Sequence, residues 1–215
     1  MHLALGTFLL FLAGPTVTAP ELTSVAYLGG SGTDDCDGIT LDGMGDIHLA
    51  CHSDSPDFPQ LPPKAVPASS DAMDAVVVKI AARSGRLAWA TRIGGSRWDA
   101  AGDLTVAQDG FVYVVGQTES TNIPTTADAV QRHFGGPPRD VFVLKLDSKG
   151  RIVYSTLLGG SKNDEPGGMA VAGDGTVYIG GVTTSPDFPG LRPASFGPGG
   201  QEDGFISRVR AWRSQ

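Results

Sequence analysis

The chain has 215 residues, of which 40% are hydrophobic and 18% are charged, and its net charge at pH 7 is −7. This length and apolar content allow one sizeable core or a row of small units. Nucleic-acid-binding proteins usually present a basic face. The Lys and Arg residues here are scattered singly, which argues against a nucleic-acid partner. Thirty Gly and 15 Pro residues without a collagen-like period indicate many tight turns and predict an all-β fold.

The N-terminus reads MHLALGTFLLFLAGPTVTAPE. Residues 3–13 form an apolar run that is too short to span a bilayer. Small residues then lead to Val17-Thr18-Ala19, a pattern typical of an export cleavage site. We expect residues 1–19 to be a signal peptide, and the mature chain to be periplasmic, secreted or at the cell surface, without an integral membrane span. A buried N-terminal element or a lipid-associated anchor is the alternative, because the segment lacks Lys and Arg and Pro20 follows the cleavage site.

A Gly-Gly-Ser tripeptide recurs every 65 residues, and an Asp and then a turn Gly follow each copy at constant spacing. A fixed internal period indicates a repeat architecture. The copies are Gly29-Gly30-Ser31, Gly94-Gly95-Ser96 and Gly159-Gly160-Ser161, followed by Asp34, Asp99 and Asp164 and by Gly45, Gly110 and Gly175. We therefore divide the chain after the signal peptide into three repeats, 20–89, 90–154 and 155–215.

Each repeat reads as four short strands with alternating apolar and polar residues, separated by Gly-rich or Ser-Gly turns. In the second repeat the first strand is expected at 103–107, the second at 112–117, the third directly after Asp140 and the fourth at 152–158. After the leader, the 3.6-residue apolar period of a helix is not evident. Antiparallel four-stranded units in series are typical of β-propeller blades.

Residues 154–189, YSTLLGGSKNDEPGGMAVAGDGTVYIGGVTTSPDFP, followed by DGFISRV, resemble the SBBP family of bacterial β-propeller repeats. The resemblance covers residues 24–210 and rests on Leu-Gly-Gly-Ser, the following Asp and Thr-x-Ser-x-Asp-Phe-Pro in combination. It implies a propeller in an exported or surface-associated bacterial protein and brings no established catalytic residues. The first copy departs from the pattern with Cys36, Cys51 and His52, and the second with Ile123-Pro124, which implies local variation within one fold.

Residues 23–31 align with the fourth strands, and the chain stops just after a third strand. We expect this N-terminal strand to complete the last blade, or the blade of a partner, because an exposed sheet edge invites aggregation. Three blades are too few for a closed propeller, which usually has about four to eight. Two chains that exchange terminal strands would form a six-bladed homodimer. The alternative is a fragment or open arc that another partner completes.

The two cysteines, Cys36 and Cys51, flank the first hairpin turn at 42–46, so folding back would place them nearly opposite each other. The second repeat has Ala101 and Gly116 at these positions, so the pair appears and disappears together. In an exported protein this predicts a disulfide. The alternative is two small buried residues. A structural zinc site needs more ligands than one thiol pair, so no metal site is predicted.

The repeated aspartates Asp34, Asp99 and Asp164 are expected at the junctions between blades, where they could form a ring of carboxylates that binds a cation or polar ligand. The alternative is that each caps a turn, and repetition in every blade favours this structural role. Trp98 is a further candidate contact for a ligand. Residues 33–42 contain clustered carboxylates that hint at calcium, but they lack the order of an EF-hand loop. No other cofactor is predicted.

No catalytic residue is predicted, because a G-x-S-x-G elbow is absent and His48, His52 and His133 are isolated. The Pro-rich loops at 55–74, 120–140 and 185–203 differ most among the repeats. They are expected either to recognise a partner or to cover blade edges. Three apolar residues in them are expected to plug between blades: Phe58, Ile123 and Phe188. His48 is expected to face solvent or a neighbouring sheet.

The sequence favours an exported binding or scaffold module without catalysis, with a protein or a glycan as ligand. The first rival is an extracytoplasmic hydrolase or lyase that uses carboxylates at the blade junctions. The second is a structural fragment of a larger surface protein. A deep pocket with convergent carboxylates would favour the enzyme.

Overall fold

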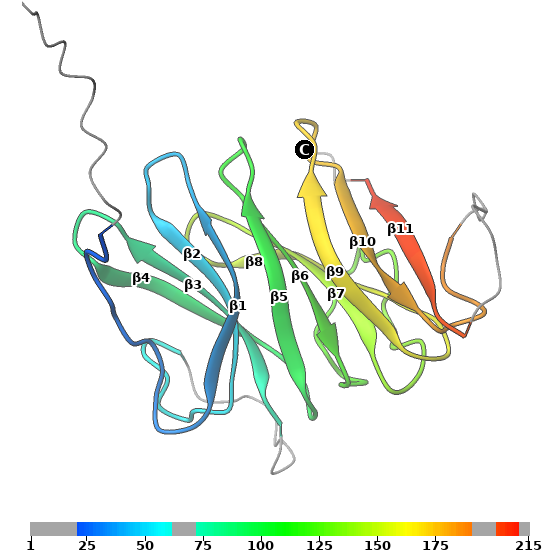
Figure 1. The fold of residues 1–215 in the computed structure, drawn as a ribbon. Coiled ribbons are helices and arrows are strands. Elements are labelled where there is room, and N and C mark those ends of the chain that lie inside the picture. Colours follow the sequence, from blue (N-terminus) through cyan, green and yellow to red (C-terminus); the bar gives the residue numbers. More distant parts are fainter. Residues whose placement is uncertain (1–20, 62–71, 191–200, 211–215) are drawn as a thin grey trace, which may run out of the picture.

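A computed structural model describes residues 21–61, 72–190 and 201–210 of the chain. Within these ranges the protein has eleven β-strands and no helix, as predicted for an all-β protein. The strands form three antiparallel sheets of four, four and three strands (Figure 1). No helix of the described part is long and apolar enough to cross a membrane. The predicted signal peptide at 1–19 lies outside the described residues.

Each sheet contains consecutive strands in sequence order, so its first strand lies at one edge. Sheet A contains β1 (Asp34–Leu41), β2 (Ile47–Ser53), β3 (Asp74–Ala81) and β4 (Arg86–Ile93). Sheet B contains β5 (Asp99–Val106), β6 (Val112–Thr118), β7 (Asp140–Leu146) and β8 (Ile152–Leu158). Sheet C contains β9 (Asp164–Val171), β10 (Val177–Thr183) and β11 (Asp203–Val209). The repeat limits drawn at 89/90 and 154/155 therefore fall inside β4 and β8.

The first hairpin of every sheet turns at a glycine. Gly45, Gly110 and Gly175 have φ angles of +80°, +78° and +78°, a conformation that a residue with a Cβ rarely adopts. Each first strand also carries a bulge against the second, for example where the register shifts between Ala101 and Asp103. The turn and bulge geometry of the backbone therefore repeats with the same 65-residue period as the sequence.

The sheets pack face to face in an open row, and the first strands β1, β5 and β9 lie next to one another (Figure 1). One apolar core fills the space between sheets A and B, and a second fills the space between sheets B and C. All seven residues of β7 are buried, because Phe142 and Leu144 enter the first core while Val141 and Val143 enter the second. A strand that is buried on both faces reads as a continuous apolar run.

The apolar residues of the Pro-rich loops enter these cores. Ile123 is buried between sheets A and B, and Phe188 packs between sheets B and C with its ring centroid 4.4 Å from that of Phe205. Phe58 is buried as well, but it covers the outer face of sheet A beside Val76 and Val78. The predicted plugs thus lie between sheets in the second and third repeats and on a free face in the first.

The predicted disulfide is present between Cys36 and Cys51, which face each other in the β1–β2 register with Cα atoms 3.9 Å apart. Cys51 is buried against the outer face of sheet A, whereas Cys36 is exposed. The bond therefore ties the first strand of sheet A to the second. Ala101 and Gly116 occupy the same cross-strand pair in sheet B.

The N-terminal segment does not complete the last sheet within the same chain, contrary to one of the two predicted pairings. Residues 21–31 form no strand, and in the described residues β11 has only β10 as a neighbour. The reason is geometric, because sheet A and sheet C lie at opposite ends of the row and the segment leads into sheet A (Figure 1). Sheet C therefore has three strands where sheets A and B have four.

Candidate functional site

The repeated aspartates Asp34, Asp99 and Asp164 are the first residues of β1, β5 and β9. Asp99 accepts hydrogen bonds from the Gly95 N–H at 2.7 Å, from the Ser120 hydroxyl at 2.8 Å and from the Thr118 hydroxyl. The equivalent donors are Gly30, Ser53 and Ser55 for Asp34, and Gly160, Thr183 and Ser185 for Asp164. Each carboxylate thus joins the Gly-Gly-Ser loop to the end of the second strand in its own repeat. These bonds support the structural interpretation of the three aspartates.

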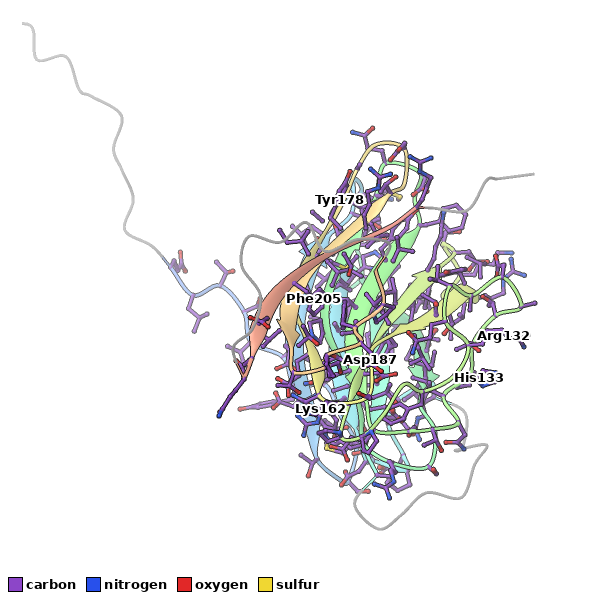
Figure 2. All side chains as sticks on the ribbon, turned by 90° about the vertical axis from the view of Figure 1, so that its right-hand side faces the viewer. Arg132, His133, Lys162, Tyr178, Asp187 and Phe205 are labelled. Carbon is purple, nitrogen blue, oxygen red and sulfur yellow. A yellow bond between two sulfur atoms is a disulfide. The ribbon has the colours of Figure 1, made fainter. Side chains whose placement is uncertain are left out.

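A second acceptor in the same loop holds the serine of Gly-Gly-Ser. Asp187 accepts from both the N–H and the hydroxyl of Ser161 at 2.8 Å, and Asp57 accepts from Ser31 in the same way. These bonds lower the pKa of Asp57 and of Asp187. Figure 2 shows Asp187 near Lys162, at the end of sheet C away from Tyr178. The polar residues of the motif Thr-x-Ser-x-Asp-Phe-Pro therefore hydrogen-bond to the Gly-Gly-Ser loop and to the Asp that follows it. In sheet C its Phe188 packs into the core between sheets B and C.

Two further aspartates, Asp74 and Asp140, begin β3 and β7 and are buried beside the first set. A Cβ placed on Gly94 would lie 2.3 Å from one carboxylate oxygen of Asp74 and 3.0 Å from one of Asp99, so only Gly fits between these two side chains. Asp74 forms an ion pair with Arg92 at 3.3 Å. Sequence reasoning missed this second set, although an Asp at the start of every third strand is visible in the repeat.

The buried carboxylates have raised pKa values. Burial raises the pKa of Asp99 to about 6, and the nearby charge of Asp74 adds to the rise. Burial likewise raises the pKa of Asp140 to about 7, with a further contribution from Asp164. Asp34 is only half-buried; burial opposes ionisation there too, but the hydrogen bonds from Ser53 and Gly30 outweigh it and lower its pKa. Asp99 at the A–B junction and Asp140 at the B–C junction therefore titrate near neutral pH.

Trp98 lies directly before Asp99 and is half-buried between side chains of two sheets. Its ring centroid is 5.9 Å from that of His52, and the Arg139 guanidinium lies 4.7 Å from the indole centroid. Arg139 also forms ion pairs with Glu119 at 3.0 Å and with Glu165 at 3.3 Å. This Trp98–Arg139 cluster, made of these five residues, connects all three sheets.

The Trp98–Arg139 cluster does not repeat. Thr33 and Asn163 take the place of Trp98 in the other repeats, and Met73 and Glu202 take the place of Arg139. Sequence reasoning singled out Trp98 and missed Arg139, Glu119 and Glu165. The available signal was that Arg139 is the only basic residue among the three that directly precede the repeated Asp at the start of the third strand.

The loop that follows β6 covers the outer edge of sheet B. The Thr126 N–H donates to the Ser155 carbonyl of β8 at 3.0 Å, and the Leu157 N–H donates to the Gln131 carbonyl at 3.0 Å. Arg132 on the same loop stays exposed and points away from the sheets (Figure 2). The second repeat therefore shows the edge-covering role that was one of the two interpretations of these loops.

The carboxylates of residues 33–42 have separate partners. Asp34 binds its own loop, while Asp42 at the other end of β1 accepts from Lys79 at 2.8 Å and contacts His48 at 3.2 Å. Burial opposes ionisation of Asp42, but the hydrogen bonds from Lys79 and His48 lower its pKa well below the usual range. His48 is buried edge-on against Trp89, which packs on the core between sheets A and B, so it faces the neighbouring sheet, one of its two predicted orientations. Among the described residues no group of three or more His, Cys, Asp or Glu is placed to hold a metal.

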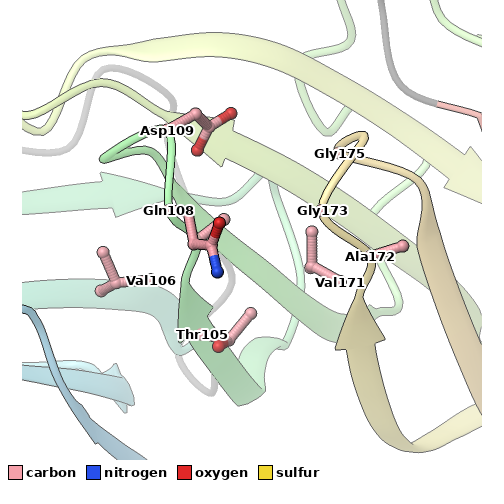
Figure 3. A pocket seen from close by; sticks show the side chains of 9 residues that line it. Thr105, Val106, Gln108, Asp109, Val171, Ala172, Gly173 and Gly175 are labelled. Atoms are coloured by element: carbon pink, nitrogen blue, oxygen red, sulfur yellow. The ribbon is translucent and has the colours of Figure 1, made fainter.

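A small cavity of about 170 Å³ lies between the first turns of sheets B and C (Figure 3). Its lining includes Thr105, Gln108 and Asp109 from sheet B and Gly173 from sheet C. Asp109 accepts from the Tyr113 hydroxyl at 3.1 Å and from Lys145 at 3.3 Å. The cavity is at the far end of β5 from Asp99, so it does not collect the repeated carboxylates.

No family model matches the chain. The chain is similar to the regulatory protein FlaEY of Caulobacter vibrioides, with 28% identity over 124 residues. The matched region is 58% of this chain and 13% of FlaEY. The chain thus spans only a small part of the length of this curated relative.

Replacing Asp99 with Ala is expected to lower the free energy of unfolding by about 3–5 kcal/mol, because the Gly95 N–H and two buried hydroxyls lose their acceptor. Urea denaturation followed by circular dichroism measures the change. The matched control, Asp187→Ala at an exposed acceptor, is expected to show a smaller loss. An Asp99→Ala variant as stable as the wild type would contradict the structural role.

Replacing Asp140 with Asn is expected to flatten the dependence of stability on pH. The pKa of Asp140 in the folded protein, about 7, is above the unfolded value of about 3.9, so its contribution is full below about pH 4 and is lost as the pH rises through 7. Between about pH 5 and pH 8 the wild type should lose at least ~1 kcal/mol relative to Asp140→Asn in urea denaturation.

Asp147→Asn is the control for this pH series, because hydrogen bonds and the charge of Arg151 overcome the effect of burial and lower the pKa of Asp147. That variant should differ from the wild type by a constant amount over the same range. A constant difference for Asp140→Asn as well would show that Asp140 does not titrate there.

Proposed function

We propose that this protein is an exported β-propeller repeat protein, of the kind that the SBBP resemblance implies, and that it acts as a non-catalytic binding or scaffold module. The observation that carries the proposal is the use of the repeated carboxylates. In every repeat the first Asp accepts three hydrogen bonds from its own loops, which leaves these groups engaged in holding the fold. The residues that differ between the repeats are therefore the candidates for ligand binding.

The propeller arrangement is supported by the way that the sheets follow one another. The first strand of each sheet lies beside the first strand of the next, and the outer strands β4 and β8 lie farther back (Figure 1). In a propeller, the first strands of successive blades surround a common axis in this manner. The open row is therefore interpreted as part of a ring.

The Trp98–Arg139 cluster is the recognition surface that we favour. It sits at the junction end of the sheets, where the repeated residues are structural and these five are not repeated. An aromatic ring with an adjacent guanidinium suits a glycan or a peptide, since both offer groups for stacking and for hydrogen bonds to Arg. Asp99 and Asp164 beside this surface are fully buried, so of the three repeated aspartates only the half-buried Asp34 is open to a ligand.

Two rivals remain distinct from this proposal. A hydrolase or lyase needs convergent carboxylates in a pocket, and the cavity between sheets B and C brings in Asp109 but not the repeated set. A structural segment of a larger surface protein is the second candidate. It is favoured by the similarity to FlaEY, which covers only 13% of that protein.

Probing glycan and peptide arrays with the chain is expected to reveal a defined group of ligands. Arg139→Ala should weaken binding at least ~10-fold, because the guanidinium both contacts the indole and holds Glu119 and Glu165. Arg151→Ala is the control, since Arg151 pairs only locally with Asp147. Silence of the wild type on both arrays would contradict the binding role and favour the structural segment.

Protein recovered from its native cells is expected to begin at Pro20 and to contain the Cys36–Cys51 bond, because export permits disulfide formation. Intact-mass spectrometry with and without reduction measures both features. An uncleaved chain with two free thiols in the cytoplasm would contradict export.

A further inference from the structure

Among the described residues, sheet C has no fourth strand. Sheets A and B end in a fourth strand, whereas in the described residues β11 pairs only with β10. The outer N–H and C=O groups of an edge strand are the groups that pair with an added segment. β8, by contrast, is covered along its outer side by the loop that contains Thr126 and Gln131.

The same chain carries an unpaired segment with the sequence pattern of a fourth strand. Residues 22–28 precede Gly-Gly-Ser just as β4 and β8 do. Three of their side chains are almost fully exposed: Leu22 at 82%, Val25 at 70% and Tyr27 at 101%. Leu28 already packs against the outer face of sheet A, as Leu158 of β8 packs toward sheet C. The segment is thus held at one end and uncovered along the rest.

The outer face of sheet C is uncovered as well. Ile206 is 80% exposed, whereas the equivalent Val77 and Val143 are fully buried beneath the next sheet. Tyr178 is 41% exposed, whereas Tyr113 at the same position is buried. A shallow apolar groove of about 370 Å³ runs over this face beside Met169, Tyr178 and Ile206. Figure 2 shows Tyr178 and Phe205 on this sheet, at the end of the row.

At the opposite end of the row, β1 of sheet A has exposed apolar residues that suit the outer face of sheet C. Ile39 and Leu41 of β1 are 69% and 61% exposed, whereas Leu104, which is equivalent to Ile39, is 4% exposed because β5 packs against sheet A. β9 packs against β5, β6 and β7 of sheet B in the same way. β1 therefore has the apolar residues of a strand that packs on a preceding sheet.

We propose that two copies of this chain associate head to tail, with residues 22–28 of each copy added as a fourth strand to β11 of the other. β1 of each copy then packs on the outer face of sheet C of the other, as β5 packs on sheet A. Within one chain the segment and the β11 edge are at opposite ends of the row, so a second copy is required (Figure 1). Two such contacts, related by a twofold axis, close a ring of six four-stranded sheets and cover the sheet faces at both ends of each row.

The β7–β8 pairing gives the register of the added strand. Val141 lies opposite Leu158, Val143 opposite Thr156 and Leu144 opposite Ser155. By the same alignment, Gly204 lies opposite Leu28, Ile206 opposite Ala26 and Ser207 opposite Val25 of the other copy. This is the main-chain recognition of a β-strand added to a sheet edge.

Light scattering coupled to size exclusion is expected to give a dimer mass for the mature chain across the micromolar range. Tyr27→Asp and Ile206→Asp should each raise the dimer dissociation constant at least ~30-fold. Both side chains are exposed in a single copy, so the far-UV circular dichroism spectrum of each variant should match that of the wild type. Val130→Asp is the matched control, since Val130 is 65% exposed on the loop that covers β8 of the middle sheet, away from both ends of the row, and it should remain dimeric.

Mixing the two variants tests the head-to-tail arrangement. The intact segment of Ile206→Asp fits the intact sheet C of Tyr27→Asp, so an equimolar mixture should recover a dimer that neither variant forms alone. A monomeric wild type, dimeric single variants, or a mixture that stays monomeric would each overturn the proposal. The contact between two copies is argued from the exposed segment and the edge of sheet C alone. Only the closed ring of six sheets rests on the proposed function, because it needs the propeller arrangement. A monomer that still captures an array ligand would leave that function standing, and a dimer without ligand would count against the binding role alone.

Discussion

The buried carboxylate at each sheet junction holds the molecule together. Asp99 is fully buried and must be satisfied where it lies, so the Gly95 N–H and the hydroxyls of Thr118 and Ser120 surround it. These donors come from the loop that enters the sheet and from the end of the second strand. One side chain thereby fixes the entry to a sheet and its second strand together, and the same arrangement recurs with Asp34 and Asp164.

This arrangement also explains the glycines around it. A Cβ on Gly94 or Gly159 would collide with the carboxylate of Asp74 or Asp140. The junction therefore places two acidic side chains close together, and burial raises the pKa of Asp99 and of Asp140. The two described carboxyl groups whose pKa is clearly raised therefore both lie at junctions between sheets.

Because the three sheets pack in a row, only the middle sheet has a neighbouring sheet on both of its faces. Sheet B is covered on both faces, and its β7 is buried throughout. Sheets A and C each keep one face without a neighbouring sheet, which leaves Ile39 at one end and Ile206 at the other exposed. Each repeat buries its apolar residues only against the neighbouring repeats. The exposed apolar faces of sheets A and C therefore result from their positions at the ends of the row.

The 65-residue period, the turn glycines and the Cys36–Cys51 pair were legible from the chain alone, because local alternation and spacing specify strands and their hairpins. The pairing of Asp74 with Asp99 and the Trp98–Arg139 cluster were not. These features join residues from different strands or sheets, and their positions follow from how the sheets stack. A linear repeat carries no record of that stacking, so three-dimensional packing settled which polar side chains are buried together and which apolar faces remain open.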